Sequence, residues 1–151
     1  MNDHEIKMVN ILSDLVDSHG VIGLKTSFED EGASFNEVIR LKEICNQTKT
    51  KLNLKIGGPE AIRDIKDSTI IGVKGLVAPM VESDFGLKKF IYAVEKYVDS
   101  SIVPALNLAI NVETKTTINN LDEILETDEV KKLYAITIGR VDLSSSLGLE
   151  R

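Results

Sequence analysis

The sequence predicts an α/β fold, a partial (β/α)8 barrel of the TIM type with about five parallel strands and intervening helices. Stretches of strand character alternate with stretches of helical periodicity along the chain, and strands begin roughly every 20–35 residues, the scale of one β–α unit. The strands are short and apolar without polar alternation, which is typical of a parallel sheet covered on both faces. Polar and acidic residues follow the strands directly, where a barrel builds its active-site face.

The predicted elements follow one another in a regular order. Residues 4–18 have the apolar stripe of an amphipathic helix, and Gly20 stands where that helix would stop. Ser34 and Glu37 have capping-box spacing and predict a second helix start, and Pro59 predicts a third. Two more helices are predicted by helically spaced apolar residues: Leu87, Phe90, Ile91 and Val94, then Ile118, Leu121, Ile124 and Leu125. The predicted strands span residues 21–28, 51–58, 73–83, 105–114 and 133–139.

The length of the chain suits one domain but not a complete barrel. The 151 residues are expected to form a single barrel-type domain over residues 1–151. A full (β/α)8 barrel takes about 200 residues or more, so we expect this domain to be incomplete at its C-terminal end. The alternatives are a barrel whose remaining strands are supplied by a partner chain, and an open sheet.

Composition excludes several classes of function. The net charge of −6 argues against nucleic acid as a partner, because a phosphate-binding face is usually basic. The single cysteine cannot form an internal disulfide, which favours a reducing, cytoplasmic location. No apolar run is long enough to cross a bilayer, and the first ten residues lack the pattern of a signal peptide, so no membrane association is expected.

Two carboxylates stand at the ends of the last two predicted strands. Glu113 follows the apolar run 108–112, and Asp142 follows the run 134–138 after a short turn. Successive strands of a β–α–β unit end on the same edge of a parallel sheet, so both carboxylates should face one cleft. With no thiolate or imidazole beside them, they suit a hard cation such as Mg²⁺ or Mn²⁺. The alternative to metal binding is a capping role, of the following turn for Glu113 and of a short helix for Asp142.

Three sequence blocks resemble the HpcH/HpaI aldolase/citrate lyase family of metal-dependent carbon–carbon lyases. They are GLVAPMVES (75–83), INVETKTTINNLDEIL (110–125) and ITIGRVDLSSSLG (136–148), and the blocks at 28–34 and 54–58 resemble it more loosely. The resemblance covers most of the chain from about Val21 onward. It implies a (β/α)8 barrel, a homo-oligomer and a small-molecule substrate.

The resemblance also implies roles for individual residues. Glu113 and Asp142 match the residues that hold Mg²⁺ or Mn²⁺ in the family. The backbone at Gly139, Arg140, Val141 and Asp142 matches the segment that binds the substrate carboxylate. Asn111 would point inward near the metal; a core hydrogen bond is the alternative.

The catalytic positions depart in part from the family pattern. Lys55 stands where an arginine commonly binds the oxo group or its enolate, and an ion-paired structural lysine is its alternative. Glu31 is the expected catalytic carboxylate of the acidic turn, with Glu29, Glu82 or a metal-bound water as other candidate bases. Gly32 stands where the pyruvate aldolases carry a histidine.

The predicted function is a divalent-metal-dependent carbon–carbon lyase of the aldolase/citrate lyase type. It would act on a 2-oxo acid or an acyl-CoA ester through a metal-stabilised enolate. The alternative is a non-catalytic scaffold or binding module of the same fold. A third option, a phosphate binder using Gly57 and Gly58, is disfavoured because the chain has neither a P-loop nor a G-x-G-x-x-G pattern.

Overall fold

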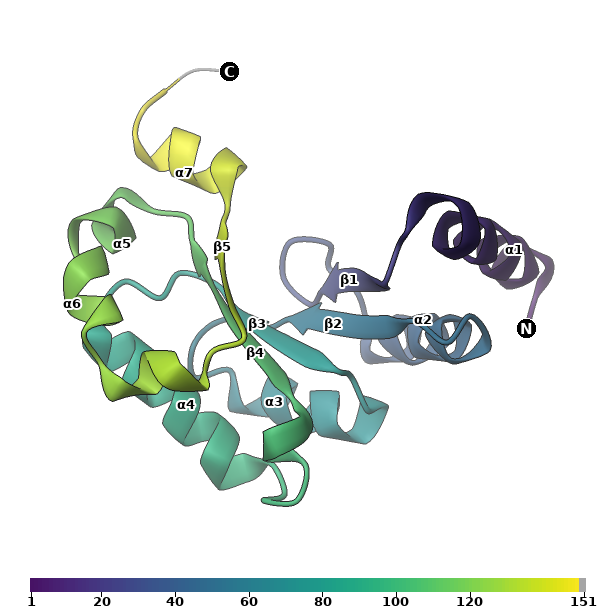
Figure 1. Cartoon of the computed structure of the whole chain (residues 1–151), viewed down its shortest axis with the longest axis horizontal. Coiled ribbons are helices and arrows are strands. Elements are labelled where there is room, and N and C mark those ends of the chain that lie inside the picture. The colour runs from purple at the N-terminus through teal and green to yellow at the C-terminus, as the bar shows by residue number, and fades with distance from the viewer. Residues whose placement is uncertain (150–151) are drawn as a thin grey trace.

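The computed structural model describes residues 1–149 and contains one five-stranded parallel sheet (Figure 1). The strands lie in chain order, so each one pairs with the next in the sequence. They are β1 (Gly23–Ser27), β2 (Lys51–Lys55), β3 (Gly75–Ala78), β4 (Asn107–Val112) and β5 (Ala135–Ile138). This order is that of a half-barrel with flanking helices, and it confirms the predicted partial (β/α)8 fold.

Helices connect the strands, and four of them begin with a side-chain cap. They are α1 (Asp3–His19), α2 (Phe35–Gln47), α3 (Ile62–Ile71), α4 (Asp84–Tyr97), α5 (Lys115–Asn119), α6 (Leu121–Leu125) and α7 (Arg140–Ser146), with 3₁₀ turns η1 (Val103–Ala105) and η2 (Asp128–Lys132). The predicted capping box of Ser34 and Glu37 is present, and Asn2 and Glu5 form a second one at α1. No helix of residues 1–149 is long and apolar enough to cross a membrane.

The core lies on the side of the sheet that the helices cover. Even-numbered strand residues such as Leu54, Leu76 and Ile110 are fully buried there. Odd-numbered residues such as Asn53 and Thr137 face the other side and line open cavities. The expectation that both faces are covered holds only in part, because Lys55 and Asn111 are buried on this second side whereas Thr137 is exposed.

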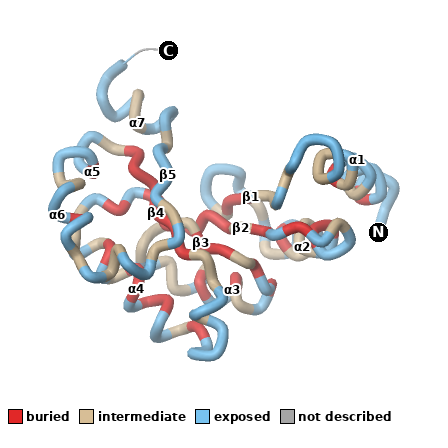
Figure 2. The backbone as a smooth tube through the Cα atoms, viewed as in Figure 1, coloured by how far each residue is buried: buried red, intermediate tan, exposed pale blue. Residues whose placement is uncertain are grey.

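The last strand is the least covered part of the sheet. Ile136 and Ile138 are 39% and 64% exposed, although they continue the apolar face of the neighbouring strands. Figure 2 shows the contrast between the buried stretches of β2 to β4 and the exposed β5 and α7. Helix α7 extends past the end of β5 and leaves this face open (Figure 1).

Two predicted helices have different bounds in the structure. Helix α3 begins at Ile62, so Pro59 lies in the preceding turn and is not the first helical residue. The predicted crossover helix between the last two strands is divided into α5 and α6. Asn120 lies between them as the C-cap of α5, with its N–H bonded to the carbonyl groups of Ile118 and Thr116.

Candidate active site

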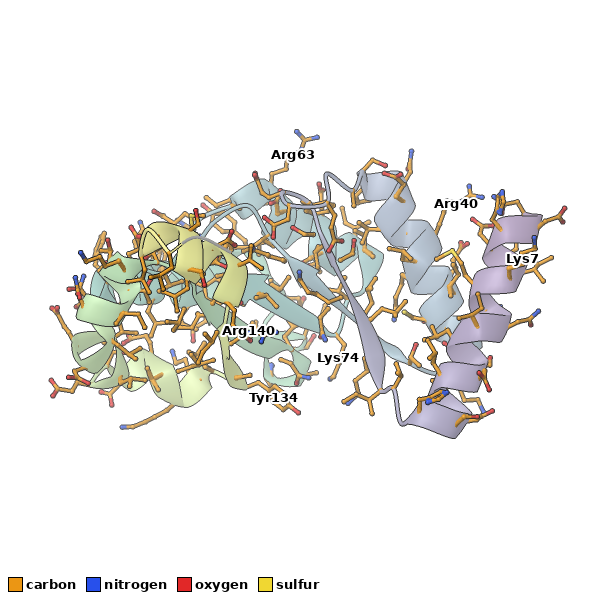
Figure 3. All side chains as sticks on the ribbon, turned by 90° about the horizontal axis from the view of Figure 1, so that it is seen from above. Lys7, Arg40, Arg63, Lys74, Tyr134 and Arg140 are labelled. Carbon is orange, nitrogen blue, oxygen red and sulfur yellow. The ribbon has the colours of Figure 1, made fainter. Side chains whose placement is uncertain are left out.

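A cavity of about 530 Å³ opens at the carboxyl ends of the strands. Its lining contains seven of the eight residues that the sequence predicts for the site; Glu31 is the exception. The residues that line it are Lys25, Asp30, Lys55, Val77, Asn111, Glu113, Thr137, Gly139, Arg140, Val141 and Asp142. Parallel pairing of β4 with β5 brings Glu113 and Asp142 to the same edge of the sheet, as their positions after the strands predict. Figure 3 shows Arg140 at the start of α7, with Tyr134 toward the other end of β5.

Glu113 is the most enclosed carboxylate of the cavity, with a side chain only 1% exposed. Its Oε1 accepts a hydrogen bond from the backbone N–H of Met80 at 3.0 Å, and its Oε2 accepts one from the Asn111 amide at 3.0 Å. Oε2 also lies 3.6 Å from the Lys55 ammonium. A buried carboxylate needs such partners, because an unpaired buried charge is strongly destabilising.

Gly139 allows this carboxylate to lie against the backbone at the end of β5. A Cβ atom at position 139 would lie 2.8 Å from both Cβ and Oε2 of Glu113. Real Cβ atoms essentially never come that close to other heavy atoms, so any other residue would force the Glu113 side chain or the backbone to move. Gly139 therefore contributes to the site by having no side chain, which leaves room for the Glu113 carboxylate.

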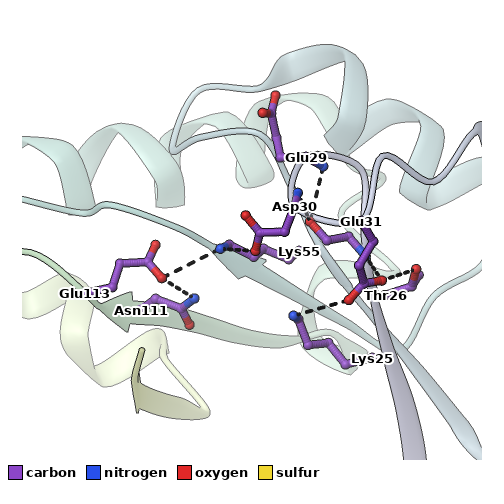
Figure 4. A network of polar contacts seen from close by, with 9 residues as sticks. Lys25, Thr26, Glu29, Asp30, Glu31, Lys55, Asn111 and Glu113 are labelled. Atoms are coloured by element: carbon purple, nitrogen blue, oxygen red, sulfur yellow. Dashed lines mark hydrogen bonds and ion pairs between the residues drawn. The ribbon is translucent and has the colours of Figure 1, made fainter. Parts of the chain in front are cut away.

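Lys55 places a positive charge among the acidic groups of the cavity. Its side chain is 4% exposed, and its Nζ lies 2.5 Å from Asp30 Oδ2 (Figure 4). Burial alone would lower the pKa of Lys55, but the hydrogen bond to Asp30 and the charges of Glu113, Asp30 and Asp142 outweigh it. The pKa therefore lies above its ordinary value, and the ammonium stays protonated. A protonated lysine can stabilise negative charge but cannot act as a nucleophile.

The acidic turn presents a different carboxylate to the cavity from the one expected. Glu31 accepts hydrogen bonds from the Thr26 hydroxyl at 2.8 Å and the Ser27 N–H at 2.9 Å, and it does not line the cavity. Asp30 lines it instead and points toward Lys55 (Figure 4). The sequence shows only a run of three acidic residues at 29–31, and no signal in it distinguishes Asp30 from its neighbours.

A family model for the HpcH/HpaI aldolase/citrate lyase family matches residues 39–151 of the sequence. The chain belongs to this family. The match confirms the resemblance seen in the three sequence blocks, two of which supply Glu113 and Asp142. Members of the family generally depend on a divalent metal ion. No curated protein matches the sequence.

Solved structures show that the fold is shared at low sequence identity. The crystal structure of the citrate synthase SbnG is 16% identical with a TM-score of 0.76, covering 92% of this chain and 60% of that chain. An HpcH/HpaI aldolase/citrate lyase family protein from Burkholderia cenocepacia J2315 is 13% identical with a TM-score of 0.73, covering 94% and 65%. An archaeal fructose-1,6-bisphosphate aldolase reaches a TM-score of 0.57 at 15% identity, covering 85% and 54%. This chain thus spans under two thirds of the length of each of these proteins.

The chemistry of the donor set fits the metal that the family implies. Within residues 1–149, no group of three or more histidine, cysteine, aspartate or glutamate side chains is arranged to hold a metal ion. The cavity nevertheless brings together the carboxylates of Glu113 and Asp142, and Mg²⁺ is usually held by only one or two carboxylates while it keeps several waters. The residues present therefore suit a hard dication and offer no soft ligand.

The other candidate residues lie outside the cavity. Glu82 accepts a hydrogen bond from the Thr114 hydroxyl at 2.7 Å, and Glu29 lies against Gly57. The N–H of Gly57 donates to Asp64 Oδ2 at 2.8 Å. That donor is already used by a carboxylate of the protein, which counts against an anion site at Gly57 and Gly58.

Proposed function

We propose that this chain carries the active site of a divalent-metal-dependent carbon–carbon lyase acting on a 2-oxo acid or an acyl-CoA ester. One observation carries the proposal: Glu113, directly after β4, and Asp142, in the first turn of α7 after β5, line one cavity that also holds the buried Lys55 ammonium. Membership of the aldolase/citrate lyase family supports the reaction class. A divalent ion held there would act as a Lewis acid toward the oxo or ester oxygen.

The residues of the chain have separate tasks in this proposal. Lys55 stabilises negative charge as it develops on the substrate oxygen, since its ammonium is buried and stays protonated. Gly139, Arg140 and Val141 line the cavity beside Glu113, which supports the proposed binding of the substrate carboxylate by their backbone. Glu31 is held by Thr26 and Ser27, so we assign it to holding the acidic turn rather than to proton transfer.

The proposal is tested by linking metal binding to folding stability. Millimolar Mg²⁺ or Mn²⁺ should raise the melting temperature of the wild-type chain, because a ligand that binds only the folded state stabilises it by mass action. Glu113→Gln should abolish that rise, whereas Glu95→Gln, at a half-exposed glutamate paired with Lys132, should keep it. An undiminished rise in Glu113→Gln would contradict the metal assignment.

Catalysis is tested separately by exchange of the methyl protons of pyruvate with solvent deuterium, followed by NMR. Exchange that requires Mg²⁺ or Mn²⁺ and is lost in Asp142→Asn supports a lyase. The absence of any exchange in a chain that metal does stabilise supports the alternative, a non-catalytic binding module. One observation favours that alternative: Gly32 stands at the histidine position, and no histidine lines the cavity in the described part of the chain. The expected homo-oligomer stays a prediction, which light scattering would test.

A further inference from the structure

The ion pair between Asp30 and Lys55 joins two groups of very different exposure. The Lys55 side chain is 4% exposed, whereas that of Asp30 is 52% exposed. Their atoms are only 2.5 Å apart, much closer than the 3.6 Å between Lys55 and Glu113. Within residues 1–149, Lys55 is the single hydrogen-bonding or ion-pairing partner of the Asp30 carboxylate.

The acidic turn is built so that Asp30 points at Lys55. The Ser27 hydroxyl accepts hydrogen bonds from the backbone N–H groups of Glu29 and Asp30, each at 3.1 Å. The Glu31 carboxylate binds back to Thr26 and Ser27, which secures the other side of the turn. The turn therefore holds the Asp30 backbone in place, and the half-exposed Asp30 side chain points toward Lys55 (Figure 4).

The Asp30 carboxylate occupies the position that an anionic ligand of Lys55 would need. A buried ammonium must keep a negative partner, because losing it leaves an uncompensated charge. Asp30 can give up its place at low cost, since half of its side chain is already hydrated. A carboxylate or enolate oxygen of a ligand can take over the pairing without leaving either protein charge unsatisfied.

We propose that Asp30 is an affinity-setting residue, an internal carboxylate that competes with anionic ligands for the Lys55 ammonium and is displaced when they bind. The proposal rests on the proposed function, which supplies the reason for an anionic ligand in this cavity. It adds that, when a ligand binds, a carboxylate of the ligand replaces the Asp30 carboxylate beside Lys55. It also identifies the ligand class that the exchange selects: small carboxylates whose oxygen reaches the buried end of the cavity.

The experiment is a titration with oxalate in metal-free buffer, followed by the NMR signal of the Lys55 side chain in ¹³C-lysine-labelled protein. Asp30→Asn should bind oxalate about 2- to 5-fold more tightly than the wild type, since ion pairs with an exposed partner are worth no more than about a fivefold change in an equilibrium constant. Asp30→Ala, which removes the acceptor, should change affinity in the same direction. Asp128→Asn is the matched control: Asp128 pairs with Lys131 at 2.6 Å on the exposed surface, and its replacement should leave the affinity unchanged.

The outcomes separate this proposal from the proposed function. Equal or weaker oxalate binding in both Asp30 variants overturns the competition, as does a Lys55 signal that fails to respond in any variant. Tighter binding in the Asp30 variants but not in Asp128→Asn supports it, even if the chain shows no metal-dependent proton exchange with pyruvate. Metal-dependent exchange with no change in oxalate affinity would keep the lyase and reject the competing carboxylate.

Discussion

Replacement of Gly139 by alanine tests whether the Glu113 carboxylate needs the space left by the glycine. The new Cβ would lie 2.8 Å from Cβ and Oε2 of Glu113, and the backbone φ of −80° at this position allows alanine without strain. The loss of stability in Gly139→Ala therefore comes from the steric contact with Glu113 alone. Glu113 has to move away from Met80 or Asn111, or β5 has to shift. Overpacking of this kind typically destabilises a protein by about 1–3 kcal/mol, and we expect the free energy of unfolding to fall by that amount.

Urea denaturation followed by circular dichroism measures this loss, with Gly58→Ala as the matched control. Gly58 also follows a strand, but a Cβ there would meet no heavy atom within 4 Å. The control should therefore stay within about 0.5 kcal/mol of the wild type. Gly139→Ala should in addition weaken any Mg²⁺-linked rise in melting temperature. If the two alanine variants were equally stable, the close packing of Glu113 against the end of β5 would be refuted.

Two further predictions concern the stability of the fold. Ile110→Ala should cost about 2–5 kcal/mol because Ile110 is fully buried, whereas Ile138→Ala should cost under about 1 kcal/mol because Ile138 is 64% exposed. Similar losses in urea denaturation would contradict the sparse cover of β5. The hydrogen bond from Arg40 holds the pKa of Glu5 below its ordinary value of 4.5. The contribution of this pair to stability should thus be complete above about pH 4.5 and be lost as the pH falls through the lower folded pKa. Arg40→Met should then lose less stability than the wild type between pH 7 and pH 3, and equal losses would exclude the pair as a source of acid sensitivity.

The strand-end carboxylates were predictable because their placement depends on local order and a general rule. An apolar run of strand length followed by Glu113, and a second run followed by Asp142, can be seen directly in the sequence. Crossover connections make successive strands parallel, which puts their carboxyl ends on one edge of the sheet. The cavity that both residues line confirms this inference. Neither step requires knowledge of which side chains touch.

The partners of those carboxylates were not predictable in the same way. Glu113 binds the backbone of Met80, which lies 33 positions earlier in the sequence, and Lys55 binds Asp30, which lies 25 positions earlier. Which residue of an acidic turn faces inward depends on turn geometry, here set by the hydrogen bonds of Ser27 and Glu31. Asp30 lines the cavity and Glu31 does not, although the two residues are adjacent in the sequence.

The sequence by itself determined the alternation of strands and helices, the capping box of α2 and the positions of Glu113 and Asp142, since each depends on spacing within a few residues or on the parallel direction of successive strands. Only the tertiary structure decided that β5 stays largely exposed, that Gly139 makes room for Glu113 and that Asp30 reaches Lys55. These features arise where segments distant in the chain pack against one another. Their contacts depend on side-chain direction and on distances of a few ångströms, which no pattern along the chain encodes.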